Sequence, residues 1–476
     1  MSFVAILVLG ALALWTGQNV ASFTNVRLLI NSATGLVLLL LAVGNVRRGA
    51  LALLAWLPFM GFQRRLIYVW EPYTFFDPIL LIGPAISVLL GGWCFLGRRQ
   101  TIREMIQTSP TARSLTLLLL LFVLQIGNPL QGGIKVGLEG ALFYIIPVLW
   151  FYIGAVFFDE RTVARIAGTV IGVTAIAAAY YLYQDYWGLH DFEMYWVEHG
   201  GWGAGLQLPG GRIRSFSVFV SPSEFGMYAV GGMLAIVAKL VYQGDPRYVP
   251  IIALGFWALF IGGGRGGIVV LFVGILVLFA LRKRRPARGM IVAIVSIIGL
   301  ILVLGQVKYE EGMFGDIGVP EPIIERQVRG LSDPFGEYSS VPNKIGFLTW
   351  GFWNSMTHNP LGHGLGSTTL AVVKHGVDSR GTEMDISDVF QASGVLGGLL
   401  YVYIIYRVFK QTFQVWLRWR GWVVPAGFGL MVAAVNKGVS GGNYVLPLIF
   451  WAVAGWLDRE WRDLAIAEEG KGQGRG

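Results

Sequence analysis

The stretch FWALFIGGGRGGIVVLFVGILVLFALRKRR, residues 256–285, decides the fold class of this 476-residue chain. One apolar segment precedes the glycine-rich turn around Arg265, a second follows it, and the basic run 282–285 ends it. Similar apolar runs recur throughout: hydrophobic residues make up 55% of the chain and charged residues only 14%, against about a quarter in soluble domains. Helices satisfy their own backbone hydrogen bonds inside a bilayer. We therefore expect an all-α fold, a polytopic transmembrane helical bundle.

The apolar segments set the expected number of spans. Fourteen segments are candidates, so the sequence predicts about 12–14 spans. They are residues 3–19, 27–44, 49–63, 77–97, 114–127, 137–158, 162–184, 216–238, 248–262, 266–281, 289–306, 394–409, 421–437 and 442–457. The segments 3–19, 49–63 and 248–262 are the weakest, and either of the first two could be a re-entrant helix.

The spans divide the chain into six consecutive parts, one of which is a large external loop domain. These parts are N-terminal transmembrane helices at 1–184, an external aromatic loop at 185–215, transmembrane helices with the arginine sites at 216–306, the large external loop at 307–393, C-terminal transmembrane helices at 394–457 and a disordered tail at 458–476.

The distribution of Lys and Arg predicts the orientation. Basic residues concentrate at one set of span ends, with Arg282–Arg285 as the strongest anchor. The positive-inside rule then makes both termini cytoplasmic and both long loops external. This distribution accounts for the net charge of +9 without nucleic acid as a partner. The single cysteine, Cys94, excludes an intramolecular disulfide. Because no basic n-region or cleavage site precedes it, 3–19 is expected to be a retained span.

Three arginines are the candidate binding residues for a phosphate-bearing substrate: Arg265 in its glycine turn, and Arg212 and Arg214 at the start of a span. A charge at membrane depth costs roughly 3 kcal/mol or more and usually marks a substrate path, and the guanidinium fork suits phosphate. Alternatively, Arg265 snorkels from a tight turn, and the other two contact lipid phosphate or pair with Glu224. Pro222 is expected to kink its span.

Candidate catalytic residues lie in the large loop. His363 stands in the glycine-rich segment 358–366, and Glu383, Asp385 and Asp388 form an acidic stretch before the next span. Histidine and carboxylates can act as general bases. A solvated loop for the histidine, and capping of a helix N-terminus for the acids, are the alternatives.

Tryptophans are the candidate glycan-binding residues. Trp350 and Trp353 recur with helical spacing in 343–357, a helix expected to lie in the membrane interface, and Trp196 and Trp202 lie in the aromatic loop. Their rings could stack on sugars or anchor the chain at the interface. The sequence has no metal-ligating motif, P-loop or dinucleotide fingerprint, so we expect neither a metal nor a cofactor.

Together these features resemble the O-antigen ligase and O-antigen polymerase superfamily of bacterial membrane glycosyltransferases. The resemblance rests on Arg214 at a span start, Arg265 in a glycine-rich turn two spans later, the element Asn-Pro-Leu-Gly-x-Gly-x-Gly at 359–366, and Gly-Val-Leu-Gly-Gly at 394–398. It covers roughly residues 150–457.

The resemblance implies a metal-independent C-type glycosyltransferase in the bacterial inner membrane. Its donor and acceptor would be undecaprenyl-pyrophosphate-linked glycans, Arg214 and Arg265 would hold the pyrophosphate, and a chain-length regulator protein would be a partner. Ligases usually carry a His-Asn pair about eleven residues before the glycine that begins the final helix group. In this chain that glycine is Gly394, and the residue eleven positions before it is Glu383. We therefore expect a polymerase of O-antigen or exopolysaccharide repeat units, with a ligase as the alternative. An anion transporter, for example for bicarbonate, and a lipid-linked oligosaccharide flippase are alternatives from other classes.

Overall fold

The computed structural model of the chain describes residues 26–72, 77–200, 206, 213–282, 291–292, 294–296, 299, 306, 310, 321–333, 335–336, 339, 341–376, 378–382, 384–439 and 444–473. Apart from an isolated bridge at Ile213, the regular secondary structure of this part is helical. The expected all-α fold is confirmed. The predicted span 3–19 and most of 289–306 lie outside the described residues.

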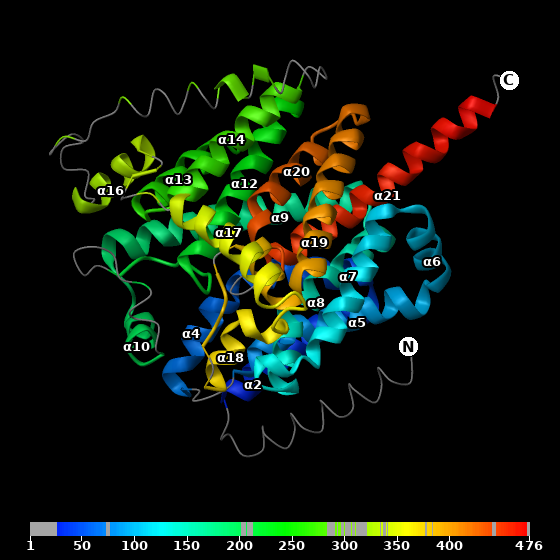
Figure 1. The fold of residues 1–476 in the computed structure, drawn as a ribbon. Coiled ribbons are helices and arrows are strands. Elements are labelled where there is room, and N and C mark those ends of the chain that lie inside the picture. Colours follow the sequence, from blue (N-terminus) through cyan, green and yellow to red (C-terminus); the bar gives the residue numbers. More distant parts are fainter. Residues whose placement is uncertain are drawn as a thin grey trace.

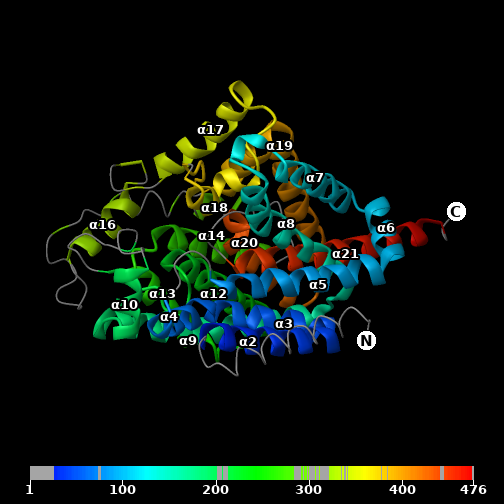
Figure 2. The ribbon, with the colours of Figure 1, turned by 90° about the horizontal axis from the view of Figure 1, so that it is seen from below.

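The helices form one bundle with shorter helices at its edges (Figures 1 and 2). In chain order they are α2 (Val26–Gly44), α3 (Val46–Trp56), η1 (Leu57–Phe59), α4 (Met60–Trp70), η2 (Pro78–Leu81), α5 (Ile82–Gly97), α6 (Arg99–Thr108), α7 (Pro110–Ile126), η3 (Pro129–Gln131), α8 (Ile134–Phe157), α9 (Glu160–Trp187), α10 (Asp191–His199), α12 (Pro222–Gln243), α13 (Val249–Ile261), α14 (Arg265–Leu281), α16 (Glu321–Ser332), α17 (Val341–Thr357), η4 (Leu365–Thr368), α18 (Leu370–Lys374), α19 (Asp385–Arg418), α20 (Val423–Ala434), η5 (Val435–Lys437) and α21 (Leu446–Gln473).

Six helices of the described part are long and apolar enough to cross a membrane: α2, η2 with α5, α8, α9, α12 and α19. A seventh span results if α6 and α7, which meet at a bend of 109°, are counted as one. The chain is thus a multi-pass membrane protein, but the expected 12–14 spans are confirmed only in part. The predicted span 49–63 is broken at Pro58 in η1, and α13, with 13 residues, rises only about 20 Å.

Two further expectations differ from the structure. The predicted disordered tail 458–476 is helical as far as Gln473, because α21 continues through a segment rich in Ala, Leu, Glu and Arg. The C-terminal helix group begins at Asp385 rather than at 394, and Gly394 interrupts α19 with a φ of 72°.

Helices α8 and α21 pack closely at the centre of the bundle. A Cβ atom on Gly154 would collide with the carbonyl group of Ala452, and one on Gly455 with the carbonyl oxygen of Phe151. Around them, the fully buried rings of Trp150, Trp451 and Trp456 are among the largest core side chains. Since lipid is as apolar as the core, such close backbone packing is a main source of stability in membrane bundles.

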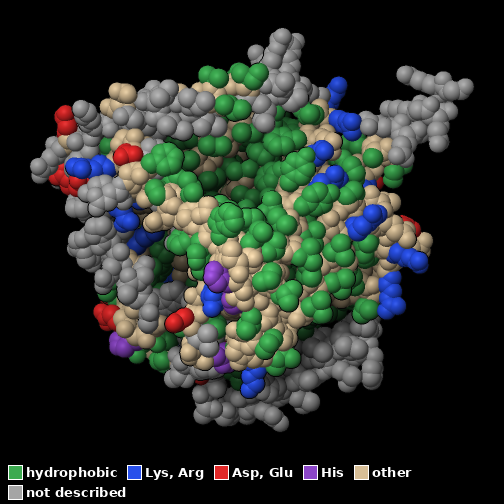
Figure 3. All heavy atoms as spheres, viewed as in Figure 1, with side chains coloured by type: hydrophobic (Ala, Val, Ile, Leu, Met, Phe, Trp, Pro, Cys, Tyr) green, Lys and Arg blue, Asp and Glu red, His purple; other side chains and the backbone are tan. Residues whose placement is uncertain are grey.

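One end of the bundle, here called the basic end, is held by polar contacts between helix termini. Arg47 at the start of α3 pairs with Asp159 before α9 at 2.7 Å. Asp458 of α21 accepts a hydrogen bond of 2.5 Å from Ser109 before α7, and Lys239 lies over the Trp422 ring. In Figure 3, Lys and Arg side chains are seen along the right side of the face, and others lie at its left and lower parts.

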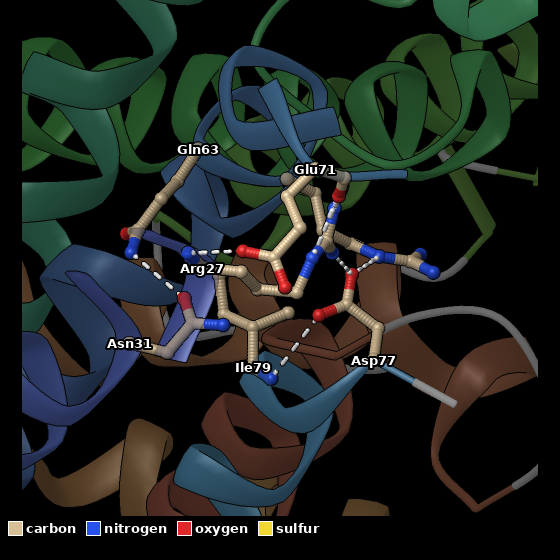
Figure 4. Close-up of polar contacts among 7 residues, drawn as sticks. Arg27, Asn31, Gln63, Glu71, Asp77 and Ile79 are labelled. Atoms are coloured by element: carbon tan, nitrogen blue, oxygen red, sulfur yellow. Dashed lines mark hydrogen bonds and ion pairs between the residues drawn. The ribbon is translucent and has the colours of Figure 1, made fainter. Parts of the chain in front are cut away.

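The opposite end contains a buried ion cluster that joins the starts of α2 and η2 to the end of α4 (Figure 4). The Asp77 carboxylate binds Arg27 at 3.1 Å and Arg64 at 2.7 Å, and its other oxygen accepts from the Ile79 amide at 3.4 Å. The Glu71 carboxylate accepts from the Arg27 backbone amide at 2.9 Å. Each buried charge therefore has a partner of opposite sign, as burial requires.

The close approach of α8 and α21 is tested by Gly455→Ala. The added methyl collides with backbone, which cannot swing away as a side chain can, so we expect a loss of about 1–3 kcal/mol in the free energy of unfolding. The matched control is Gly168→Ala, because a Cβ at this helical glycine of α9 meets nothing within 4 Å. Thermal unfolding in detergent, followed by tryptophan fluorescence, measures both. Equal melting temperatures for the two variants would contradict this packing.

Candidate anion-binding site

Arg265 is the first residue of α14 and follows a tight turn at the end of α13. Gly263 has a φ of 72°, in the left-handed region that favours glycine, and its carbonyl accepts from the Arg265 amide at 3.0 Å. A Cβ on Gly262 would collide with the Tyr181 hydroxyl of α9. The glycines thus let the turn close tightly against a neighbouring helix and place Arg265 at the helix start.

Helix α16 lies across the Arg265 side chain. The guanidinium donates from Nη1 to the Arg326 carbonyl at 3.1 Å, and a Cβ on Gly330 would overlap it. Gln327 donates to the Phe260 carbonyl at 2.5 Å, which fastens α16 to the end of α13. The short helix expected from Pro320 to Leu331 is therefore present, and it covers the predicted arginine.

Four positive charges from four segments converge here, and we call Arg214, Arg265, Arg326 and Lys344 the cationic cluster. The charges of Arg326 and Arg214 both act on the Arg265 guanidinium. Lys344 of α17 lies beside the turn, since a Cβ on Gly266 would be 3.7 Å from its Nζ. The structure thus brings together Arg214 and Arg265, which stand 51 positions apart in the sequence (265 − 214).

One hydrogen-bond donor of the Arg214 side chain is unpaired within the described part of the chain. Its Nε is buried and has no hydrogen-bond partner among the described residues, whereas its backbone amide donates to the Leu206 carbonyl at 2.7 Å. An unpaired buried donor is costly, and an anion would satisfy it. Arg212, the third predicted arginine, lies outside the described residues.

The segment after Arg214 corrects one prediction. Pro222 does not kink a span: it is the first residue of α12, and Ser221 caps the helix by accepting from the Glu224 amide at 3.2 Å. Proline suits this position because its missing N–H is not needed there. The Glu224 carboxylate is buried and accepts from the Tyr444 amide at 2.7 Å, so it holds the segment before α21.

The acidic candidates Asp385 and Asp388 lie in the first turns of α19, and both are buried. Asp385 accepts from the backbone amides of Gly438 and Val439, the latter at 3.0 Å. Asp388 accepts from the Thr382 amide at 2.6 Å and from its hydroxyl at 2.9 Å. Both carboxylates therefore hold loops against the helix start. Glu383 lies outside the described residues.

His363 is buried where the two glycine elements of the sequence meet. Val395 donates to the Pro360 carbonyl at 3.0 Å, and His363 donates from its backbone to the Gln391 carbonyl at 2.8 Å. Its Nε2 lies 2.7 Å from the Asn359 amide nitrogen. The loop 359–366 is thus docked on the break in α19 at Gly394, an association that the sequence alone did not show.

The imidazole of His363 is held in its neutral form. Burial, together with the positive charge of Arg380, lowers its pKa below the ordinary value. Nε2 then accepts from the Asn359 amide group, and Nδ1 faces the Gln391 carbonyl at 3.4 Å. A neutral imidazole has the protonation state of a general base.

The tryptophan candidates lie in different surroundings. Trp350 and Trp353 are 42% and 59% exposed on α17, whose opposite face packs on α19 through Gly351 and Ser355. Trp196 is only 2% exposed and packs edge-on against Phe216, which leaves no free face for a sugar ring. Trp202 lies outside the described residues.

Helix α17 links the cationic cluster to the loop around His363. Lys344 stands near its start, and Asn354 donates to the Gln391 side chain at 2.8 Å near its end. At about 1.5 Å per residue, the two positions are about 15 Å apart along the helix. The cationic cluster therefore lies near the start of α17 and the loop of His363 near its end, with the exposed Trp350 and Trp353 rings between them.

Within the described residues, no group of three or more His, Cys, Asp or Glu side chains could hold a metal ion. No model of a known protein family matches the chain, and no curated protein sequence matches it significantly.

The lowered pKa of His363 predicts a pH-dependent stability. A group whose pKa falls on folding contributes stability that is complete above its ordinary pKa, near 6.5, and that is lost as the pH drops through the folded value. His363→Gln removes this titration, so the melting temperature of the wild type should exceed that of the variant near neutral pH and approach it at about pH 5. A difference between the two melting temperatures that stays constant with pH would contradict the lowered pKa of His363.

Proposed function

We propose that this protein is a membrane glycosyltransferase whose cationic cluster binds the pyrophosphate of undecaprenyl-pyrophosphate-linked glycans and which polymerises their repeat units. The observation that carries the proposal is the convergence of Arg214 and Arg265 with Arg326 and Lys344 beneath α16. The resemblance to the O-antigen ligase and polymerase superfamily assigns the same two arginines to the pyrophosphate.

The chemistry of transfer fits such a cluster. When the glycan leaves its carrier, negative charge develops on the pyrophosphate, and fixed positive charges stabilise it in the transition state. Arginine binds phosphate oxygens with two parallel donors, which also orients the leaving group. An anion between these side chains would also relieve the repulsion that Arg214 and Arg326 exert on Arg265. No metal is required in this scheme.

A lipid-linked substrate also needs apolar surroundings and a base. The face in Figure 3 is hollowed near its centre, and the visible walls of the hollow are hydrophobic side chains. We propose His363, whose imidazole is neutral, as the first candidate for the base that activates the acceptor hydroxyl; the hydroxyl would take the place of the Asn359 amide group at Nε2. Asp385 and Asp388 are the further candidates, and their carboxylates accept from backbone amides. The exposed rings of Trp350 and Trp353 would contact the glycan.

The proposal includes an orientation. Because the basic end should face the cytoplasm, the cationic cluster would face the periplasm of a bacterial inner membrane, where the lipid-linked repeat units are polymerised. A ligase that delivers the glycan to another lipid acceptor is the alternative within the same class.

A reconstitution assay tests the proposal. Protein in lipid vesicles is given undecaprenyl-pyrophosphate-linked oligosaccharides without metal, and product length is followed on a gel. A ladder of longer lipid-linked glycans is the expected result. Single transfer to an added lipid acceptor would indicate a ligase. If no glycan product forms, but inorganic anions cross the vesicle membrane, the protein would be an anion transporter.

Removal of either central arginine should abolish transfer. Arg265→Ala and Arg214→Ala are expected to leave expression and folding nearly unchanged, and Arg265→Lys should also lose most activity because an ammonium group cannot bind two phosphate oxygens in parallel. Initial rates in the vesicle assay and melting temperatures are measured together. Unfolding of both alanine variants would instead indicate a structural role.

The packing of Arg265 against α16 gives a more selective variant. In Gly330→Ala the new methyl displaces the Arg265 guanidinium, so affinity for inorganic pyrophosphate should fall about tenfold at an unchanged melting temperature. Gly346→Ala on α17 is the control, because a Cβ there meets nothing within 4 Å. If both variants bind pyrophosphate as the wild type does, α16 does not position Arg265.

A further inference from the structure

A second arginine, Arg65 of α4, is completely buried and binds the segment that follows Arg214. Its Nη1 donates to the Phe219 carbonyl at 2.7 Å, and its Nη2 donates to the Ser217 carbonyl at 2.5 Å. Its guanidinium carbon lies 4.5 Å from the centre of the Phe216 ring. One side chain thus contacts Phe216, Ser217 and Phe219 in a stretch of irregular backbone, residues 213–221, here called the arginine loop.

The charge of Arg65 is balanced by a second buried network. Glu193 of α10 lies 3.5 Å from the Arg65 Nε, and Gln184 of α9 donates to the same Glu193 oxygen at 2.7 Å. The side-chain carbonyl oxygen of Gln184, Oε1, in turn accepts from the Ser217 amide at 2.7 Å and from the Phe216 amide at 3.3 Å. Arg65 therefore binds two carbonyls of the arginine loop, while Gln184 binds two of its amides.

The arginine loop needs this support because its backbone is strained. Ser217 has a φ of 56°, and it is the one non-glycine residue with positive φ in the described part of the chain. Such a conformation is unfavourable for a residue with a side chain and persists only where the surroundings enforce it. Ser217 also donates from its hydroxyl to the Ala177 carbonyl at 2.6 Å.

The break between η1 and α4 brings a third contact to the loop. Because the helix restarts at Met60, the Phe62 amide is available and donates to the Val218 carbonyl at 2.9 Å. Gly61 permits this approach, since a Cβ there would lie 2.5 Å from the Phe219 carbonyl carbon. The break that interrupts a predicted span thus serves to dock α4 on the arginine loop.

We propose that Arg65 is a positioning residue: by fixing residues 216–219 in their strained conformation it aims Arg214 into the cationic cluster. Arg214 stands between two fixed points, its own amide bound to Leu206 and the clamped Phe216 two residues later. The inference rests on the proposed function, since it assigns Arg65 to pyrophosphate binding without contact to the ligand.

The Arg65→Lys substitution tests whether Arg65 positions the arginine loop or contributes only its size and positive charge. Arg65→Lys keeps the positive charge beside Glu193 but has no fork, so it cannot bind both loop carbonyls and Glu193 in the same geometry. Affinity for inorganic pyrophosphate, measured on the full chain in lipid nanodiscs, should fall about tenfold. In the Arg214→Ala background the same substitution should change affinity by less than about twofold, because the residue through which it acts is gone.

Hydrogen–deuterium exchange supplies a readout that does not depend on the ligand. In Arg65→Lys, peptides covering 213–221 should exchange faster, and those of α8 and α21 should keep their wild-type rates. Arg27→Lys is the matched control: Arg27 is also buried, and it binds Glu71 and Asp77 at the same end of the bundle. It should change neither the exchange of 213–221 nor the affinity for pyrophosphate.

The two proposals can fail separately. If the wild type does not bind pyrophosphate, the proposed function is contradicted, and faster exchange at 213–221 in Arg65→Lys still supports the clamp on the loop. If the wild type binds and Arg65→Lys has wild-type affinity and wild-type exchange, the positioning role is overturned. An equal loss of affinity in the presence and absence of Arg214 would also overturn it, because Arg65 would then act by another route.

Discussion

Positive charges that repel one another are held together at one end of this apolar bundle, and the rest of the structure must supply the free energy that keeps them there. Arg265 is placed by a glycine turn and held under α16, while Arg214 is aimed by a strained loop. Neither position is one that an arginine would adopt for its own stability. Binding sites for anions are commonly assembled at such cost, because the ligand recovers the electrostatic energy when it binds.

The free energy comes from packing and from charges that are paired elsewhere. Close contact of α8 and α21 at Gly154 and Gly455 lets the two backbones approach. The buried charges at the same end behave differently from the cationic cluster: Asp77 neutralises Arg27, and Glu193 faces Arg65. Within the cationic cluster, by contrast, the positive charges of Arg326 and Arg214 act on the Arg265 guanidinium.

The parts of the candidate site that depend on residue type and membrane position are predictable from the sequence. Arg265 and Arg214 were identifiable because a guanidinium beside a span has few inexpensive explanations. Arg326 and Lys344 were not, because a charged residue in a long polar loop is ordinary until the fold brings it to the cluster. Trp196 was misjudged for the same reason: an aromatic residue in a loop can belong to a small core of its own, and this one packs on Phe216.

Two of the predicted spans differ from the helices of the structure for a different physical reason. Hydropathy reports how apolar a segment is, but not whether its helix is continuous. Pro58 breaks one apolar segment, and the restart at Met60 turns α4 toward the arginine loop. Likewise Pro222 lies where the hydropathy pattern places the interior of a span, yet it begins the helix, because Ser217 to Ser221 are needed as irregular backbone.

Each of these helix breaks lies beside one part of the candidate site. Irregular backbone at membrane depth is tolerated where protein groups satisfy its amides and carbonyls, and Arg65 and Gln184 do so for residues 216–219. The interruption of α19 at Gly394 is satisfied in the same way by the loop that carries His363. One break thus supports the candidate anion site and the other supports the candidate base, with α17 spanning the distance between them. In the proposed transfer the pyrophosphate belongs to the donor and the reacting hydroxyl to the acceptor, and the hydroxyl must reach the sugar carbon that carries the pyrophosphate. The two breaks would therefore position two substrates that meet along α17.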